Sequence, residues 1–228
     1  VKEAFRHSWS AYREFAWGRD EFQPLGRKAK SDWIGLGLTT VDALSTLHIM
    51  GLKAELAEAR DWIATNLSVK KALSKPVSFF ETVIRCLGGL LSAWELTGDA
   101  VFKEKAAEVG AALSKAFASP SGLPYAQVNL HTGAGSVATW TKGNVLLAEV
   151  GTVQLEFGKL AQATGDASYW TKAAAVFDHL DAKHVGKPAP LTTPGGGRLW
   201  PLYISPSTGE LTGQSVSFGA MGDSYYEY

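Results

Sequence analysis

Apolar and polar residues alternate with the period of α-helices through most of the chain. Large aromatic side chains recur every three or four residues between Phe5 and Phe15, and apolar residues recur similarly over 41–48 and 83–94. Further helices are predicted over about 53–67, 100–117, 147–163 and 168–184. Loops rich in Gly or Pro are predicted at 18–35, 68–78, 118–143 and 186–198. Strand signals are sparse, although 199–204 with the turn at 207–209 favours a short hairpin.

Three segments repeat one pattern, in which a glycine stands eight residues before an alanine. The segment 96–106 resembles 163–173, and a fainter copy runs over 50–59. In each copy the glycine is predicted to end one helix in a left-handed cap, and the alanine to let the returning helix pack closely. The glycines are at positions 51, 98 and 165, and the alanines at 59, 106 and 173. Three helix hairpins in series predict an all-α solenoid or toroid.

Both ends of the chain read as cuts through a larger fold. Residues 223–228 form the first turns of a helix that has no C-cap and no terminating Gly or Pro. An open arc of helix hairpins would leave its apolar inner faces in water. We therefore expect residues 1–228 to be the N-terminal part of a single barrel domain, closed by further chain or by a partner chain.

Composition excludes several classes of partner. The 22 Lys and Arg residues balance 22 Asp and Glu residues, which argues against a nucleic-acid or anionic-membrane partner, since both need a basic surplus. The longest apolar stretch, 86–94, is far shorter than the roughly 18–20 residues that span a bilayer. The only cysteine, Cys86, lies among apolar residues and is predicted to be a buried structural thiol.

Three acidic residues stand at or near the start of apolar helices. Glu81 precedes Gly98 by 17 residues, Glu149 precedes Gly165 by 16, and Asp223 opens the last predicted helix. An acid in the first helical turn commonly caps the helix or complements its dipole. In a helical toroid, however, the same positions line the cavity, where paired carboxylates serve acid–base chemistry. Both interpretations stay open for all three.

Other polar residues within the apolar helices have ordinary explanations. Arg85 follows Glu81 by four residues, so it forms either an intrahelical ion pair or a cavity cation that binds hydroxyls. Asp42 is a further candidate cavity acid, although a structural role is favoured. His7 and His48 are predicted to be core histidines. No common metal, phosphate-loop or nucleophile-elbow motif is present, and 195–197 is predicted to be a flexible Gly loop.

Several blocks of the sequence resemble a known family, the class I α-1,2-mannosidases of glycoside hydrolase family 47. The blocks follow the family order from end to end and correspond to about the first half of its catalytic domain. They are AFRHSWSAY (4–12), FAWGRDE (15–21), GLGLTTVDAL (35–44), FETVIR (80–85), GGLLSA (88–93), PSGLPY (120–125) with VN (128–129), AEV (148–150) with QLEF (154–157), and GDSYYEY (222–228).

The resemblance implies an (αα)7 barrel that removes terminal α-1,2-linked mannose from high-mannose N-glycans with inversion. Glu81 matches the family's catalytic acid and Asp223 a second catalytic acid, while Arg85 and Glu149 match sugar-contacting positions. The catalytic base and the threonine that binds the family's calcium would lie beyond Tyr228, so no metal ligand is expected here. The family and the sequon at Asn66 imply the ER or Golgi lumen, or secretion.

Two departures from the family pattern bear on specificity. The usual Asp-Ala-Leu-Asp-Thr is here Asp42-Ala-Leu-Ser45-Thr, which loses one acid near the barrel interior. Met221 stands where ER-type members carry Arg, which favours a broader trimming pattern. The alternatives to an enzyme are a mannosidase-like glycan-binding protein of ER quality control with little turnover and, less favoured, a helical scaffold without a ligand.

Overall fold

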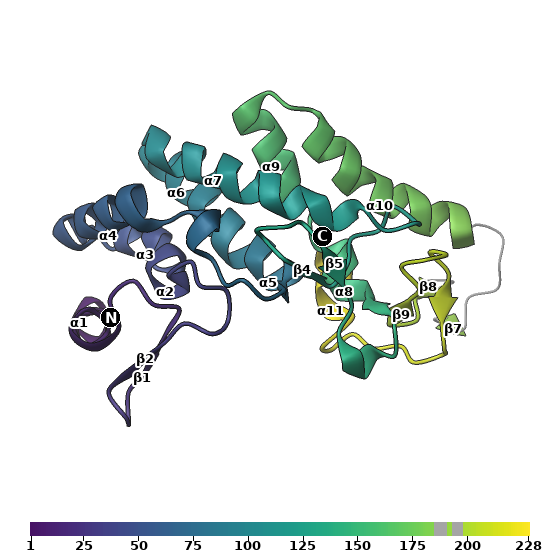
Figure 1. The fold of residues 1–228 in the computed structure, drawn as a ribbon, viewed down its shortest axis with the longest axis horizontal. Helices are drawn as coiled ribbons and strands as arrows, with labels where there is room; N and C mark the ends of the chain where they lie inside the picture. Colours follow the sequence, from purple (N-terminus) through teal and green to yellow (C-terminus); the bar gives the residue numbers. More distant parts are fainter. Residues whose placement is uncertain (185–190, 193–197) are drawn as a thin grey trace.

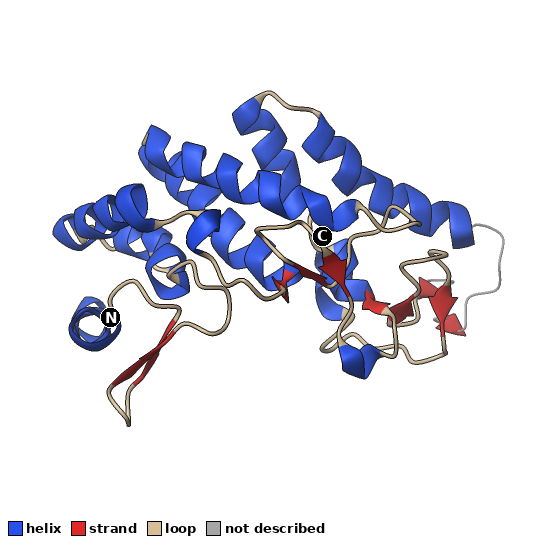
Figure 2. Cartoon of the chain, viewed as in Figure 1, coloured by secondary structure: helices blue, strands red, loops and turns tan. Residues whose placement is uncertain are grey.

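A computed structural model describes residues 1–184, 191–192 and 198–228. The chain is helix-rich, with short strands gathered beside one edge of the helical arc (Figures 1 and 2). The helices are α1 (Lys2–Ala16), α2 (Leu38–Asp42), α3 (Leu44–Ile49), α4 (Lys53–Asn66), α5 (Phe79–Glu81), α6 (Gly88–Thr97), α7 (Ala100–Leu113), α8 (Leu147–Gly151), α9 (Gln154–Thr164), α10 (Ser168–His184) and α11 (Asp223–Glu227). A π-helical segment, η2, spans Thr82–Leu87, and short 3-10 segments are η1 (Val69–Lys71), η3 (Ser114–Phe117) and η4 (Thr139–Thr141).

Three helix hairpins form the frame of the molecule, as the repeat predicts. They are α3–α4, α6–α7 and α9–α10, and each turns at its predicted glycine, with φ of 66° at Gly51, 71° at Gly98 and 77° at Gly165. The three alanines of the repeat, at 59, 106 and 173, are each 0% exposed. Helix α3 packs on α6 and α6 on α9, while α4 packs on α7. The hairpins therefore stack side by side in two layers.

The strands are two or three residues long and pair in four small antiparallel sheets. They are β1 (Glu21–Gln23), β2 (Lys28–Lys30), β3 (Val77–Ser78), β4 (Gln127–Val128), β5 (Gly135–Ser136), β6 (Val145–Leu146), β7 (Leu191–Thr192), β8 (Arg198–Leu199), β9 (Tyr203–Ile204) and β10 (Leu211–Thr212). The predicted hairpin is confirmed as β9–β10, turning at Gly209. The other strands lie mainly in predicted loops, because two or three residues are too few to show an alternating pattern.

Three predicted helices are interrupted, and the clearest break has a tertiary cause. The helix predicted over 147–163 divides into α8 and α9 at Thr152 and Val153. A Cβ at Gly151 would lie 2.4 Å from the ring of Tyr225, and the Thr152 hydroxyl bonds Ser224 at 2.8 Å. Contact with α11 thus ends α8 where the apolar pattern would continue it. The segments 41–48 and 83–94 are similarly divided, at Ala43 and by η2.

The core runs continuously beneath the hairpins. Phe79, Phe117 and Phe157 form a cluster of edge-on and tilted rings whose centroids lie 5.3–6.2 Å apart. Cys86 is fully buried as predicted, and burial raises the pKa of its thiol. The prediction for His7 is wrong: α1 turns Trp9 into the core and leaves His7 exposed.

Two further predictions concern membrane-spanning helices and the Gly loop. In the part of the chain that the structure describes, no helix combines the length and apolar character needed to cross a membrane. The Gly loop predicted at 195–197 lies outside the described residues.

Candidate active site

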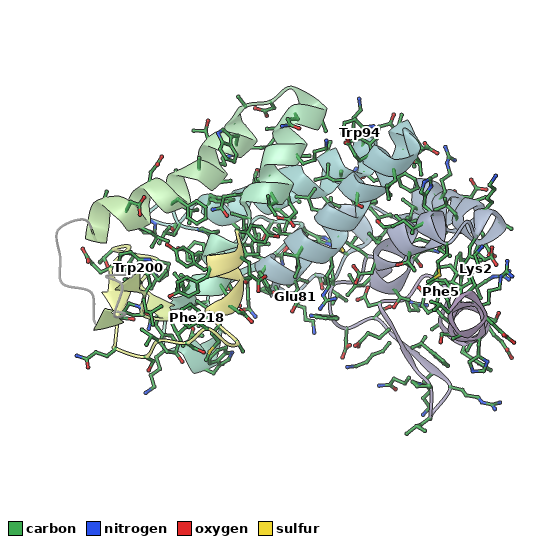
Figure 3. The ribbon with its side chains drawn as sticks, turned by 180° about the vertical axis from the view of Figure 1, so that it is seen from behind. Lys2, Phe5, Glu81, Trp94, Trp200 and Phe218 are labelled. Carbon is green, nitrogen blue, oxygen red and sulfur yellow. The ribbon has the colours of Figure 1, made fainter. Side chains whose placement is uncertain are left out.

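Three acidic residues that the sequence singles out meet in one groove. Helix α8 packs against both α5 and α11, which brings Glu81, Glu149 and Asp223 together from three separate helices. Glu81 lies near the middle of the molecule (Figure 3). The groove has a volume of about 340 Å³ and is lined by Phe80, Glu81, Leu146, Ala148, Glu149, Ala220, Met221, Asp223, Ser224 and Glu227.

Glu81 does not cap its helix. The Ser78 hydroxyl accepts the backbone N–H of Glu81 at 3.2 Å and so performs that role. The Glu81 carboxylate instead accepts a hydrogen bond from Nε of Arg85 at 2.5 Å. Its side chain remains 26% exposed, so part of the carboxylate is open to the groove. The capping interpretation is therefore excluded for Glu81.

Arg85 connects Glu81 to a second carboxylate. Its Nη1 lies 3.4 Å from Oδ2 of Asp42, and its guanidinium carbon lies 5.2 Å from the centre of the Trp33 ring. The hydrogen bond with Glu81 is the main cause of a raised pKa for Arg85. Burial raises the pKa of Asp42, an effect that Arg85 partly offsets. Asp42, the last residue of α2, thus forms a charged cluster with Arg85 and Glu81.

Glu149 is the most unusual carboxyl group of the groove. Its Oε2 is buried and has no hydrogen-bond partner among the described residues. Burial raises the pKa of Glu149 to about 7, with a smaller contribution from the negative charge of Glu81. Near neutral pH this carboxyl group therefore exchanges between an acid that donates a hydrogen bond and a carboxylate that accepts one.

Asp223 and Met221 also line the groove. Asp223 begins α11, and its Oδ1 accepts the backbone N–H of Ser224 at 2.9 Å, so this acid does contact its own helix end. The carbonyl of Met221 accepts the N–H of Ala148 at 3.0 Å, which ties this wall to the start of α8. Met221 has φ of 76°, in the left-handed region that favours glycine. Residues with such strain gather at functional sites.

One residue that shapes the site was missed by sequence reasoning. Asp20 is 1% exposed, and its two carboxylate oxygens accept five consecutive backbone N–H groups, from residues 34 to 38, at 2.6–3.2 Å. This arrangement fixes the loop between Trp33 and α2, which carries Asp42. The glycines at 35 and 37, with φ of 82° and 72°, were the available signal of a tight backbone turn.

The family resemblance implies calcium, and the described residues are expected to hold no ligand for it. Among residues 1–184, 191–192 and 198–228, no group of three or more His, Cys, Asp or Glu side chains could hold a metal ion. The second acid of the family's Asp-Ala-Leu-Asp-Thr pattern is replaced by Ser45, whose hydroxyl bonds that of Ser92 at 2.8 Å. These residues do not fit a calcium site, so no chemical step is assigned to a metal below.

Comparison with known proteins agrees with the fold. The model of glycosyl hydrolase family 47 matches residues 4–228, and the chain belongs to this family. Its fold matches about half of the (αα)7 barrel of the α-1,2-mannosidases: an α-1,2-mannosidase from Trichoderma reesei superposes with a TM-score of 0.87 at 28% sequence identity, over 100% of this chain and 48% of that one.

Curated relatives lie at higher identity. The mannosyl-oligosaccharide 1,2-alpha-mannosidase MNS1 of Arabidopsis thaliana is 43% identical over the whole chain, which covers 39% of that protein. The endoplasmic reticulum mannosyl-oligosaccharide 1,2-alpha-mannosidase of Homo sapiens is 42% identical, and the chain covers 31% of it. The chain therefore spans about a third of the length of the curated relatives it matches and about half of the solved structure.

Proposed function

We propose that the whole protein is an inverting α-1,2-mannosidase that trims terminal mannose from high-mannose oligosaccharides. The observation that carries this proposal is the meeting of Glu81, Glu149 and Asp223, from three separate helices, in one groove. Inverting hydrolysis requires one carboxyl group to protonate the leaving oxygen and a second to activate water on the opposite face of the sugar. Groups on several helices can surround a sugar ring in this way.

In this proposal Glu81 and Asp223 act on the leaving oxygen, and the base that activates water comes from outside residues 1–228. Arg85 orients the Glu81 carboxylate through Nε and binds sugar hydroxyls with its remaining N–H groups, since its side chain is 38% exposed. Glu149, with its raised pKa and unpartnered oxygen, binds a sugar hydroxyl as donor or acceptor. Release of water from the groove on binding strengthens each of these contacts.

Calcium dependence and location are proposals for the whole protein. The relatives named as endoplasmic reticulum mannosidases favour the lumen of the secretory pathway. If the whole protein requires calcium, its mannosidase activity falls on treatment with EDTA and returns on addition of the ion. The ligands would have to come from outside the described residues.

The test measures mannose release by the whole protein from α-1,2-mannobiose and from a high-mannose oligosaccharide. We expect release with inversion, seen by proton NMR as β-mannose before mutarotation. Glu81→Gln should reduce kcat by at least about 100-fold, as loss of a general acid does. The control is Glu104→Gln, at an exposed position of α7 away from the groove. Tight oligosaccharide binding without mannose release would instead identify a glycan-binding protein.

A further inference from the structure

A second pocket lies beside the candidate active site. It has a volume of about 230 Å³, and its lining includes Trp140, Lys142, Asn144, Tyr203 and Thr212. Trp140 is 60% exposed, although indole is among the side chains with most apolar area to bury. The lining thus combines an open aromatic face with hydroxyl, amide and ammonium groups.

The sheet β6–β9–β10 connects this pocket to the groove. Leu146 of β6 pairs with Tyr203 of β9, which pairs in turn with Thr212 of β10. Directly paired residues of antiparallel strands project to the same face, so these three side chains form one row. Leu146 lines the groove, whereas Tyr203 and Thr212 line the second pocket. The two pockets are therefore lined by neighbouring members of one row of paired residues, on strands about 4.8 Å apart.

The pocket is held in shape by hydrogen bonds in its wall. The Thr141 hydroxyl contacts the carbonyls of Ala138 and Asn144 at 2.8 and 2.6 Å, and the Asn144 amide donates to the carbonyl of Thr141 at 3.0 Å. The Thr212 hydroxyl donates to Oδ1 of Asn144 at 3.0 Å and so joins this turn to β10. The segment that carries Trp140 is thereby fixed on the sheet, and little ordering is needed when a ligand binds.

The mouth of the pocket is open. A Cβ built at Gly213 would meet nothing within 4 Å, and Lys142, with φ of 53°, stands exposed at the turn. An exposed indole face suits the C–H face of a sugar ring, and the Lys142 ammonium and Tyr203 hydroxyl can bond its hydroxyls.

We propose that this pocket, around Trp140, is an oligosaccharide subsite that stacks a sugar ring beyond the two joined by the cleaved bond. The inference rests on the proposed function. The groove is within the size range of small-molecule sites, roughly 300–1,000 Å³, so it suits the disaccharide at the cleaved bond. The adjoining pocket then receives the next ring, along the row from Leu146 to Tyr203.

The test compares Trp140→Ala with the whole unaltered protein on two substrates. For a high-mannose oligosaccharide we expect KM to rise about fivefold to tenfold while kcat stays within twofold, since one stacking contact is lost. For α-1,2-mannobiose, which ends before the pocket, both constants should stay unchanged. Trp140→Tyr should recover most of the oligosaccharide KM. The matched control is Trp170→Ala, at a tryptophan of α10 that is 50% exposed.

Three outcomes would overturn the subsite. They are an unchanged oligosaccharide KM in Trp140→Ala, an equal loss on both substrates, and an equal effect of Trp170→Ala. If the unaltered protein cleaves neither substrate, the proposed function fails instead. The subsite is then tested by calorimetric titration with the oligosaccharide: weaker binding by Trp140→Ala alone supports it, and equal binding by both variants rejects it.

Discussion

Nε of Arg85 lies 2.5 Å from Oε2 of Glu81, while Nη1 of the same side chain lies 3.4 Å from Oδ2 of Asp42. One guanidinium thus links a carboxylate of the groove to the end of α2. The Trp33 ring beneath it restricts the side chain further. The planar fork of arginine suits this double contact, and a lysine ammonium has a different shape.

Arg85→Lys should therefore keep the positive charge but lose the planar double contact that orients the Glu81 carboxylate. We expect kcat/KM for the oligosaccharide to fall on the order of tenfold to 100-fold, which corresponds to about 1.4–2.7 kcal/mol. Arg13→Lys is the control, because Arg13 forms an exposed ion pair with Glu58 on the surface. Equal kinetics of Arg85→Lys and the unaltered protein would show that Arg85 contributes only its charge.

Glu149→Gln should stabilise the protein increasingly as pH rises. The folded-state pKa of Glu149 is raised to about 7, above its ordinary value of 4.5, so the folded state holds a proton that the unfolded chain releases in this window. The contribution of the protonated Glu149 side chain to the free energy of unfolding is thus complete below about pH 4.5, and it is lost as pH rises through 7. Glutamine has no such loss, and we expect its advantage in the free energy of unfolding to grow by about 3 kcal/mol between pH 4.5 and pH 8.

The measurement is urea denaturation of both proteins at several pH values. The difference between Glu104→Gln and the unaltered protein should stay nearly constant, since that side chain is exposed. A constant difference for Glu149→Gln as well would mean that the Glu149 carboxyl group is ionised as in water.

Replacement by glycine should affect the stability of the protein differently at its two methionines. Met221 has φ of 76°, which costs an L-residue roughly 1–2 kcal/mol, so Met221→Gly should leave stability within about 1 kcal/mol or increase it. Met50 has φ of −75° at the end of α3, where glycine gains nothing and should destabilise by about 1 kcal/mol. Thermal denaturation of both variants tests the contrast, and a larger loss for Met221→Gly would contradict it.

Asp20→Asn should be among the more damaging isosteric changes. The amide keeps one acceptor oxygen, but it loses the charge and sets N–H groups against backbone donors in a buried site. We expect destabilisation by about 3–5 kcal/mol, because hydrogen bonds to charged groups are worth more than neutral ones. Asp61→Asn, at a side chain that is 75% exposed, should change stability by less than about 1 kcal/mol. Chemical denaturation distinguishes the two.

The periodic part of the fold was predictable because it depends on local chemistry. Glycines at 51, 98 and 165 permit the left-handed turn, and the alanines eight residues later permit close packing, so the repeat alone predicts the hairpins. The three acids could be selected for the same reason, since each stands near the start of a helix. Their meeting in one groove depends on how α5, α8 and α11 pack.

The remaining features depend on contacts distant in sequence. The break at Thr152 follows from Tyr225 and Ser224, more than 70 positions along the chain, and no local pattern records it. Asp20 looked like one polar residue of a loop, because its five partners are backbone groups that have no sequence signature. The roles of Glu81, Arg85, Glu149 and Asp223 in the reaction remain predictions.

The π-helical segment Thr82–Leu87 lies between Glu81, which lines the groove, and α6, which belongs to one of the three repeated helix hairpins. A π turn holds one more residue than an α turn, and such turns behave as single-residue insertions into an α-helix. Rewinding the same residues as a regular α-helix, with none deleted, would rotate Glu81 by about 100° relative to α6 and carry it off the groove. The π turn therefore keeps Glu81 in phase with α6 despite the surplus residue, and a homologue one residue shorter here would keep the same phase with an ordinary α turn.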